Sequence, residues 1–106
     1  MKDPHTLHIS TITSDWLDKD LLMLHACFQL LTDCVEKENL FESRDWTYDS
    51  EHMNAKTEIE ELYNWWKYRS QKEINREIDP IWTDNQYEFD NGMLIRLIKV
   101  RQYLWT

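Results

Sequence analysis

One stretch limits what this chain can fold into: residues 17–38, LDKDLLMLHACFQLLTDCVEKE, are apolar over too much of their circumference for an ordinary surface helix. Two apolar stripes follow helical spacing, one formed by Leu17, Leu21, Leu24, Phe28, Leu31 and Val35 and the other by Met23, Cys27, Leu30 and Cys34. Such a helix must be covered by other elements. We therefore expect it to be the centre of the fold.

The polar residues in the second half of this helix share one face. Their spacing places them on a single narrow stripe, which comprises His25, Gln29, Thr32, Asp33 and Glu36. Any functional site on this helix depends on whether the stripe faces water, a partner or a pocket.

Composition favours helices, since the chain has only one glycine and two prolines among 106 residues. We predict a mainly α fold, a three-helix bundle-like single domain (residues 1–106). It would have an extended arm or short strand at 1–13 and helices at 15–38, 50–78 and 90–104. The strand would pair with residues 46–48 or with a neighbouring subunit.

Core positions follow from the same periodicity. They are Ala55, Ile59, Leu62, Tyr63 and Trp66 in the second helix, Leu94, Leu97, Ile98, Leu104 and Trp105 in the third, and Trp82 and Phe89 in the connector. The polar residues 70–77 are expected to project into solvent. Arg101 falls within the apolar face of the third helix, so we predict that it pairs with Asp33, Glu36, Glu58 or Glu61.

The charge balance, 12 basic against 20 acidic residues, gives a formal net charge of −8 and argues against direct nucleic-acid binding. Cys27 and Cys34 lie roughly 10 Å apart along a helix, too far for a disulfide, and are predicted to be reduced core thiols. Neither a secretory signal nor a membrane span is expected, which favours a cytoplasmic location.

Three segments resemble known sequences: LHACFQLLTDCVEKE (24–38), EIEELYNWWK (58–67) and NGMLIRLIKVRQYLWT (91–106). They resemble segments of small acidic proteins of unknown function encoded by tailed bacteriophages. The resemblance implies a phage genome and expression in the host bacterial cytoplasm, and it transfers no catalytic residues. Small phage accessory proteins often take over or disarm a host system, which suggests a host target.

Two carboxylate pairs are the main candidates for chemistry. Asp33 and Glu36, and Glu58 and Glu61, each have i, i+3 spacing, which suits oxygen ligation of Mg²⁺ between adjacent helices. This is similar in outline to the all-α nucleoside triphosphate pyrophosphohydrolases. In a chain with 20 acidic residues such spacings also arise by chance, so the competing interpretation is a solvated helix face without metal.

Trp65 offers a different hypothesis, since Trp66 faces the core and Trp65 must then point to the flank beside Tyr68. An exposed Trp-Tyr pair rimmed by Glu58 and Glu61 is typical of a protein-interaction hot spot. The alternative is that Trp65 packs beneath the 39–49 loop or the arm. For His25, a hydrogen-bonded structural role is favoured over a catalytic one.

Together with the residues above, the resemblance implies a non-enzymatic phage accessory protein, a homo-oligomer, that binds and inhibits or sequesters a host component, with anti-phage defence as one target class. It would act through its acidic and aromatic surface, or through a nucleotide-binding pocket. The candidate binding residues are His25, Gln29, Trp65, Tyr68 and Arg101. The alternative is a Mg-dependent nucleotide pyrophosphohydrolase that uses Asp33, Glu36, Glu58 and Glu61.

Overall fold

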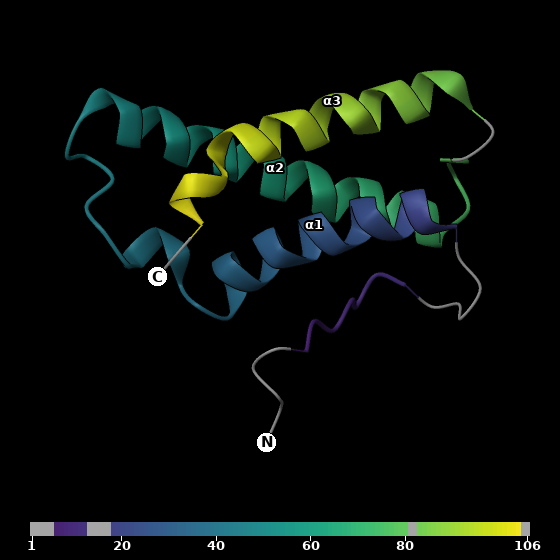
Figure 1. The fold of residues 1–106 in the computed structure, drawn as a ribbon, viewed down its shortest axis with the longest axis horizontal. Coiled ribbons are helices and arrows are strands. Elements are labelled where there is room, and N and C mark those ends of the chain that lie inside the picture. Colours follow the sequence, from purple (N-terminus) through teal and green to yellow (C-terminus); the bar gives the residue numbers. More distant parts are fainter. Residues whose placement is uncertain (1–5, 13–17, 81–82, 105–106) are drawn as a thin grey trace.

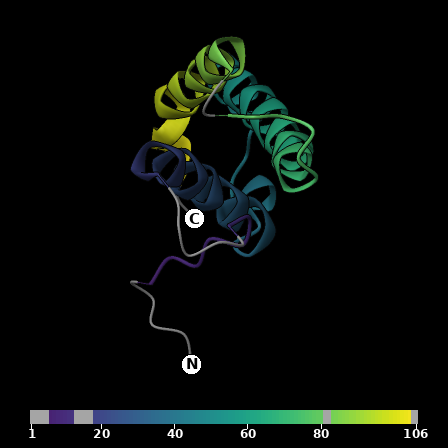
Figure 2. The same cartoon turned by 90° about the vertical axis from the view of Figure 1, so that its right-hand side faces the viewer.

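The computed structural model describes residues 6–12, 18–80 and 83–104. These residues form three α-helices, α1 (Lys19–Glu36), α2 (Ser50–Ile74) and α3 (Asp84–Val100), with two 3-10 turns, η1 (Leu40–Glu42) and η2 (Arg101–Tyr103). Helices α1 and α3 lie side by side and run in the same direction, while α2 runs the opposite way behind them (Figure 1). Viewed along their axes, the helices occupy the corners of a triangle (Figure 2). The predicted three-helix, mainly α fold is confirmed.

The core lies on the inner side of α1, as predicted. Phe28 has no exposed surface and stacks on Trp66 with the ring centroids 4.8 Å apart. Around this pair lie the other fully buried apolar side chains, Leu31, Leu40, Ile59 and Leu62. The predicted core face of α2 is confirmed at Ala55, Ile59, Leu62 and Trp66, whereas Tyr63 is half-buried because its hydroxyl reaches outward to Glu36.

The helix ends differ from the prediction in several places. Residue 15, the predicted start of the first helix, lies outside the described residues, but Asp18 is extended (ψ 143°), so α1 begins at Lys19, later than predicted, and ends at Glu36, two residues early. Helix α2 begins at Ser50 as predicted, with the Asp49 carboxylate accepting a hydrogen bond from the backbone N–H of His52. It ends at Ile74 rather than at residue 78, because Arg76 takes a left-handed conformation (φ 61°) that turns the chain.

Helix α3 begins at Asp84, six residues before the predicted start. The prediction placed the start too late because a carboxylate occupies an apolar position on the core face of the first turns. Asp90 is 4% exposed, so the apolar period does not become visible until Met93. The core side of α3 is Met93, Leu97 and Val100, while the predicted core residues Ile98 and Phe89 are 54% and 56% exposed. Leu94 and Leu104 are half-buried. The predictions for Trp82 and Trp105 lie outside the described residues.

Of the two forms predicted for the N-terminal segment, a short strand or an arm, the described residues 6–12 form an arm: they pair with no strand, and the backbone N–H of Ile12 donates to the Ile9 carbonyl in a turn. They pass beneath α1 as an arm (Figure 1). The backbone N–H and the hydroxyl of Ser10 both donate to the side-chain oxygen of Gln29, each over 3.0 Å. A helix side chain therefore supplies the hydrogen bonds that a partner strand would have supplied. Within the described chain, no helix has the length and apolar character needed to cross a membrane.

Candidate functional site

The first part of the polar stripe of α1, His25, Gln29 and Thr32, is buried beneath the arm and α2, whereas Asp33 is half-buried and Glu36 is exposed. His25 is 1% exposed and Gln29 is 3% exposed. The Nδ1 atom of His25 lies 2.6 Å from the Thr11 hydroxyl, and its Nε2 atom lies 3.0 Å from the Glu73 carboxylate. Because a carboxylate only accepts, Nε2 carries a proton and donates to Glu73, while Nδ1 and the Thr11 hydroxyl share the second hydrogen bond. One imidazole thus joins the arm, α1 and α2.

A second set of bonds continues from Glu73 to α3. Arg69, 2% exposed, donates to Glu73 within α2 and holds Asp90 of α3 with two bonds, of 2.9 Å and 2.6 Å. Gln86 donates to the same carboxylate over 2.9 Å. Burial acts to lower the pKa of Arg69, but its hydrogen bonds to Asp90 and Glu73 outweigh burial and raise it. The side chains Thr11, His25, Glu73, Arg69 and Asp90, here called the polar network, connect every helix of the bundle to the arm.

Thr11, His25 and Glu73 place a hydroxyl, an imidazole and a carboxylate in a row, which is the arrangement that activates a nucleophile in acyl transfer. A nucleophile has to be reached by its substrate, whereas this imidazole is enclosed and its carboxylate is shared with the guanidinium of Arg69. The geometry supports the structural role that was favoured for His25: these bonds fasten the arm to the bundle.

Sequence reasoning identified His25 but missed the other four network residues, Thr11, Arg69, Glu73 and Asp90. Residues 70–77 were expected to project into solvent, but Ser70 is 5% exposed and the Glu73 side chain is 18% exposed. A signal was present: Asp90 lies seven residues before Leu97, on the core face of α3, and a carboxylate there requires a buried cation. Arg69, four residues before Glu73, was the available cation.

The predicted ion pair of Arg101 is wrong. Arg101 is exposed and, within the described chain, makes no ion pair with any of the four predicted carboxylates. It lies in η2, beyond the last turn of α3, so its direction departs from the one that helical periodicity predicts. It borders a depression that Leu30, Asp33 and Cys34 also line.

The four candidate metal ligands are separated and already paired. Glu36 accepts from Tyr63 and Lys67 on one flank of α2, while Glu58 and Glu61 accept from Arg96 on the opposite flank. Asp33 accepts from Gln29 over 2.8 Å and pairs with Lys37 at 3.4 Å. In the chain as described, no three His, Cys, Asp or Glu side chains are grouped so that they could hold a metal ion. The geometry therefore does not bring the two acidic pairs into one site.

Both cysteines are free thiols, as predicted. Burial, together with the neighbouring Glu38, raises the pKa of Cys34 to about 11, and burial raises that of Cys27. Each thiol is therefore protonated near neutral pH and is a weak nucleophile.

A polar cavity of about 300 Å³ lies between the arm, α1 and α2. Gln29 and Thr32 line it from α1, and Trp66 and Ser70 line it from α2. Two lysines, Lys37 and Lys67, also reach it, each paired with an acid. Of the residues predicted to form a nucleotide pocket, only Gln29 borders this cavity; Trp65 and Arg101 lie elsewhere.

Aromatic side chains gather where α2 and α3 meet. Trp65 is half-buried, with its ring 5.3 Å from Phe28 and 6.0 Å from Phe89, so it packs against α1 and α3 rather than beneath the loop or the arm. Beside it, Tyr68 is 63% exposed and Phe89 is 56% exposed. Glu61, with 64% of its side chain exposed, lies one helical turn away. We call these four residues, Trp65, Tyr68, Phe89 and Glu61, the aromatic face.

Replacing Glu73 with Gln should weaken the dependence of stability on pH. Burial acts to raise the pKa of Glu73, but hydrogen bonds from His25 and Arg69 outweigh it and lower that pKa below its ordinary value of 4.5. A lowered pKa stabilises the fold above the unfolded-state value, and this contribution is lost as the pH falls below about 4.5 and through the lowered pKa of the folded state. Urea unfolding across this range should give a flatter profile for E73Q than for the wild type. The exposed Glu60→Gln serves as the control, and equal slopes for E73Q and the wild type would contradict the prediction.

Comparison of the chain with protein-family models, curated proteins and solved structures finds no match.

Proposed function

We propose that this protein is a non-enzymatic accessory protein of bacteriophage origin that acts in the host cytoplasm. It would bind a host protein through the aromatic face and inhibit or sequester it; a component of anti-phage defence is the target class we favour. The observation that carries the proposal is the exposure of Tyr68 and Phe89 beside Trp65, on a chain with a net charge of −8.

Large aromatic side chains at the surface are the residues that contribute most at protein interfaces. Trp65 is held by Phe28 from beneath, so its ring is positioned before binding and little side-chain entropy is lost. The net negative charge of the chain favours a target with a basic surface and speeds association with it.

Removing the exposed rings should abolish capture of the target while leaving the fold intact. We expect the double substitution Tyr68→Ala and Phe89→Ala to weaken binding by about 30-fold or more, since a hot-spot ring contributes about 2 kcal/mol. Tyr48→Ala is the matched control, because Tyr48 is 76% exposed but lies before α2, away from the aromatic face. The measurement is affinity capture from bacterial lysate followed by titration of the captured protein. Equal binding by both variants would refute the aromatic face as the binding site.

The polar cavity favours a second candidate function, sequestration of a small nucleotide. Its hydroxyl and amide groups can bind a base or sugar, and Lys37 and Lys67 can approach a phosphate. Incubation with a panel of nucleotides and Mg²⁺ separates the hypotheses. Stoichiometric binding supports sequestration, and turnover supports the pyrophosphohydrolase alternative. If the protein neither binds nor turns over any nucleotide, the result supports the protein target.

A further inference from the structure

A second surface, formed by α1 and α3, is apolar and largely exposed among the described residues, with Thr6 and Leu7 of the arm bordering it beside Leu30. It consists of half-buried Cys27 and Leu94 together with side chains that are 53–59% exposed, namely Met23, Leu30, Ile95 and Ile98. Met23 and Leu94 border one shallow depression, so the two helices contribute to a continuous surface. We call these six residues the apolar face. It lies on the side of α3 opposite to Phe89, and so it is distinct from the aromatic face.

The middle of the apolar face carries no charge. Residues 21–32 of α1 contain no Asp, Glu, Lys or Arg. On α3, residues 91–98 contain one charged residue, Arg96, which points to α2 and binds Glu58. A strip this apolar on a chain that is 30% charged is unusual unless something covers it.

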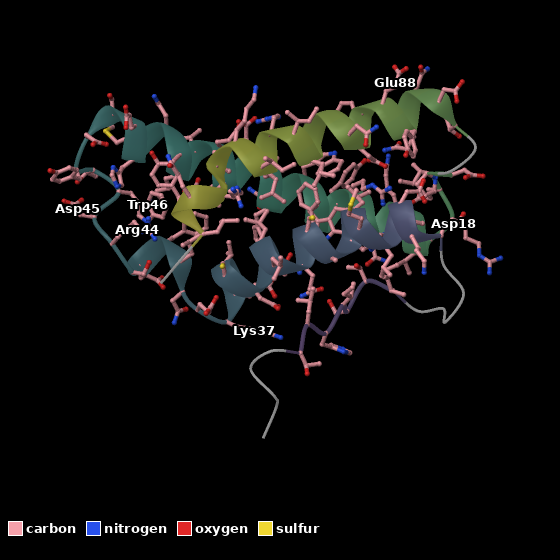
Figure 3. All side chains as sticks on the ribbon, viewed as in Figure 1. Asp18, Lys37, Arg44, Asp45, Trp46 and Glu88 are labelled. Atoms are coloured by element: carbon pink, nitrogen blue, oxygen red, sulfur yellow. The ribbon has the colours of Figure 1, made fainter. Side chains whose placement is uncertain are left out.

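The two ends of the apolar face differ in charge. Because α1 and α3 run in the same direction, both helix starts lie at one end, which carries Lys19 together with four acids, Asp18, Asp20, Asp84 and Glu88. The opposite end carries Lys37 and Arg101, with Asp33 and Glu38. Figure 3 shows Asp18 and Glu88 at one end of this helix pair and Lys37 toward the other. Lys37 already neutralises Asp33, whereas Arg101 has no ion pair within the described residues.

We propose that the apolar face binds a second copy of this chain about a two-fold axis through its middle. Such an axis reverses the partner, so the Arg101 end of each copy faces the acidic end of the other and Arg101 meets the partner's Asp20. An isologous interface needs a self-complementary surface, and this one is apolar in the centre, acidic at one end and carries the unpaired Arg101 of the described chain at the other. Helices of 17 and 18 residues lying side by side give a face about 26 Å long and roughly 20 Å wide. Its area, about 520 Å², is smaller than the roughly 800 Å² per partner of a standard interface and fits a dimer of moderate affinity.

The test is the oligomeric state of the full chain by sedimentation equilibrium. At about 100 µM, the wild type should be a dimer with a Kd in the micromolar range or below. Leu30→Glu and Ile98→Glu each place a charge in the centre of the interface and should raise the Kd about 100-fold or more. Met53→Glu is the matched control, since Met53 is 53% exposed, like Leu30, but lies on α2. Circular dichroism confirms that each variant is folded.

A charge exchange tests the orientation. Arg101→Glu and Asp20→Arg should each weaken the dimer about 10-fold, and the double variant should recover most of the loss because the pair is restored with opposite signs. A monomeric wild type, a dimer unaffected by Leu30→Glu and Ile98→Glu, or a double variant no better than the single ones would overturn the proposal. The aromatic-face variants should remain dimers, so a failure here is separable from a failure of the proposed function.

Discussion

Replacing Arg69 with methionine should lower the free energy of unfolding by about 3–5 kcal/mol, the range measured when one partner of a buried ion pair is removed. Arg69 is 2% exposed and is the cation that neutralises both Asp90 and Glu73. Without it, Asp90 keeps only the Gln86 amide among its described partners and leaves a negative charge enclosed. Since a domain of this size is stable by about 5–15 kcal/mol, the loss should be visible at once in urea unfolding followed by circular dichroism.

Arg96→Met is the matched control for this result. Arg96 also binds two carboxylates, those of Glu58 and Glu61, but 36% of its side chain is exposed and water screens the pairs. Its loss should therefore cost about 1 kcal/mol or less. Adding Asp90→Asn to Arg69→Met should recover part of the stability, because the amide removes the unpaired charge. Equal losses for Arg69→Met and Arg96→Met would contradict the assignment of Arg69 as the buried cation.

Replacing Trp66 with alanine should lower the free energy of unfolding by about 3–5 kcal/mol, as for Arg69→Met, because it leaves a large cavity in the core. The indole of Trp66 is 1% exposed and lies between Phe28, which stacks on it at 4.8 Å, and the edge of His25 at 4.9 Å. The substitution therefore removes packing from the apolar core and from the polar network together. Differential scanning calorimetry should show a melting temperature lowered by about 10 °C or more.

Tyr68→Ala controls for the loss of an aromatic ring from α2. Tyr68 is 63% exposed, so its replacement should change the free energy of unfolding by about 0.5 kcal/mol or less. A Trp66→Ala variant that unfolds with the wild type would contradict the core described above.

The apolar pattern predicted the fold well and the polar interior poorly, for one physical reason. Residues such as Phe28, Leu62 and Trp66 are buried by the hydrophobic effect, which is non-directional and produces a periodic apolar pattern in the sequence. Three helices and most of their inner faces could therefore be predicted. A buried charge depends on its partner, and the partner is distant in sequence: Arg69 and Asp90 are 21 residues apart, and His25 and Glu73 are 48 apart. One sequence does not show which distant groups meet.

The predictions for Arg101 and His25 illustrate the difference. A cation on the apolar face of the third helix was expected to find a carboxylate, but the chain leaves α-helical geometry at Arg101 and the expected direction no longer holds. The stripe that contains His25 and Gln29 was expected to be met by other parts of the molecule, and the arm and α2 do meet it. The stripe follows from local helical spacing, whereas the identity of Thr11 and Glu73 as partners does not.

The state of the His25 imidazole tests the central claim, that a buried polar network joins the arm to the helices. Long-range ¹H–¹⁵N NMR spectra should show His25 with a proton on Nε2, exchanging slowly with water and close in space to protons of Trp66 on α2. Thr11→Val should perturb the Nδ1 resonance and leave the Nε2 proton in place, because only the bond from the arm is lost. A His25 Nε2 proton that exchanges with water as fast as that of exposed His8, or an Nε2 that carries no proton, would contradict the account.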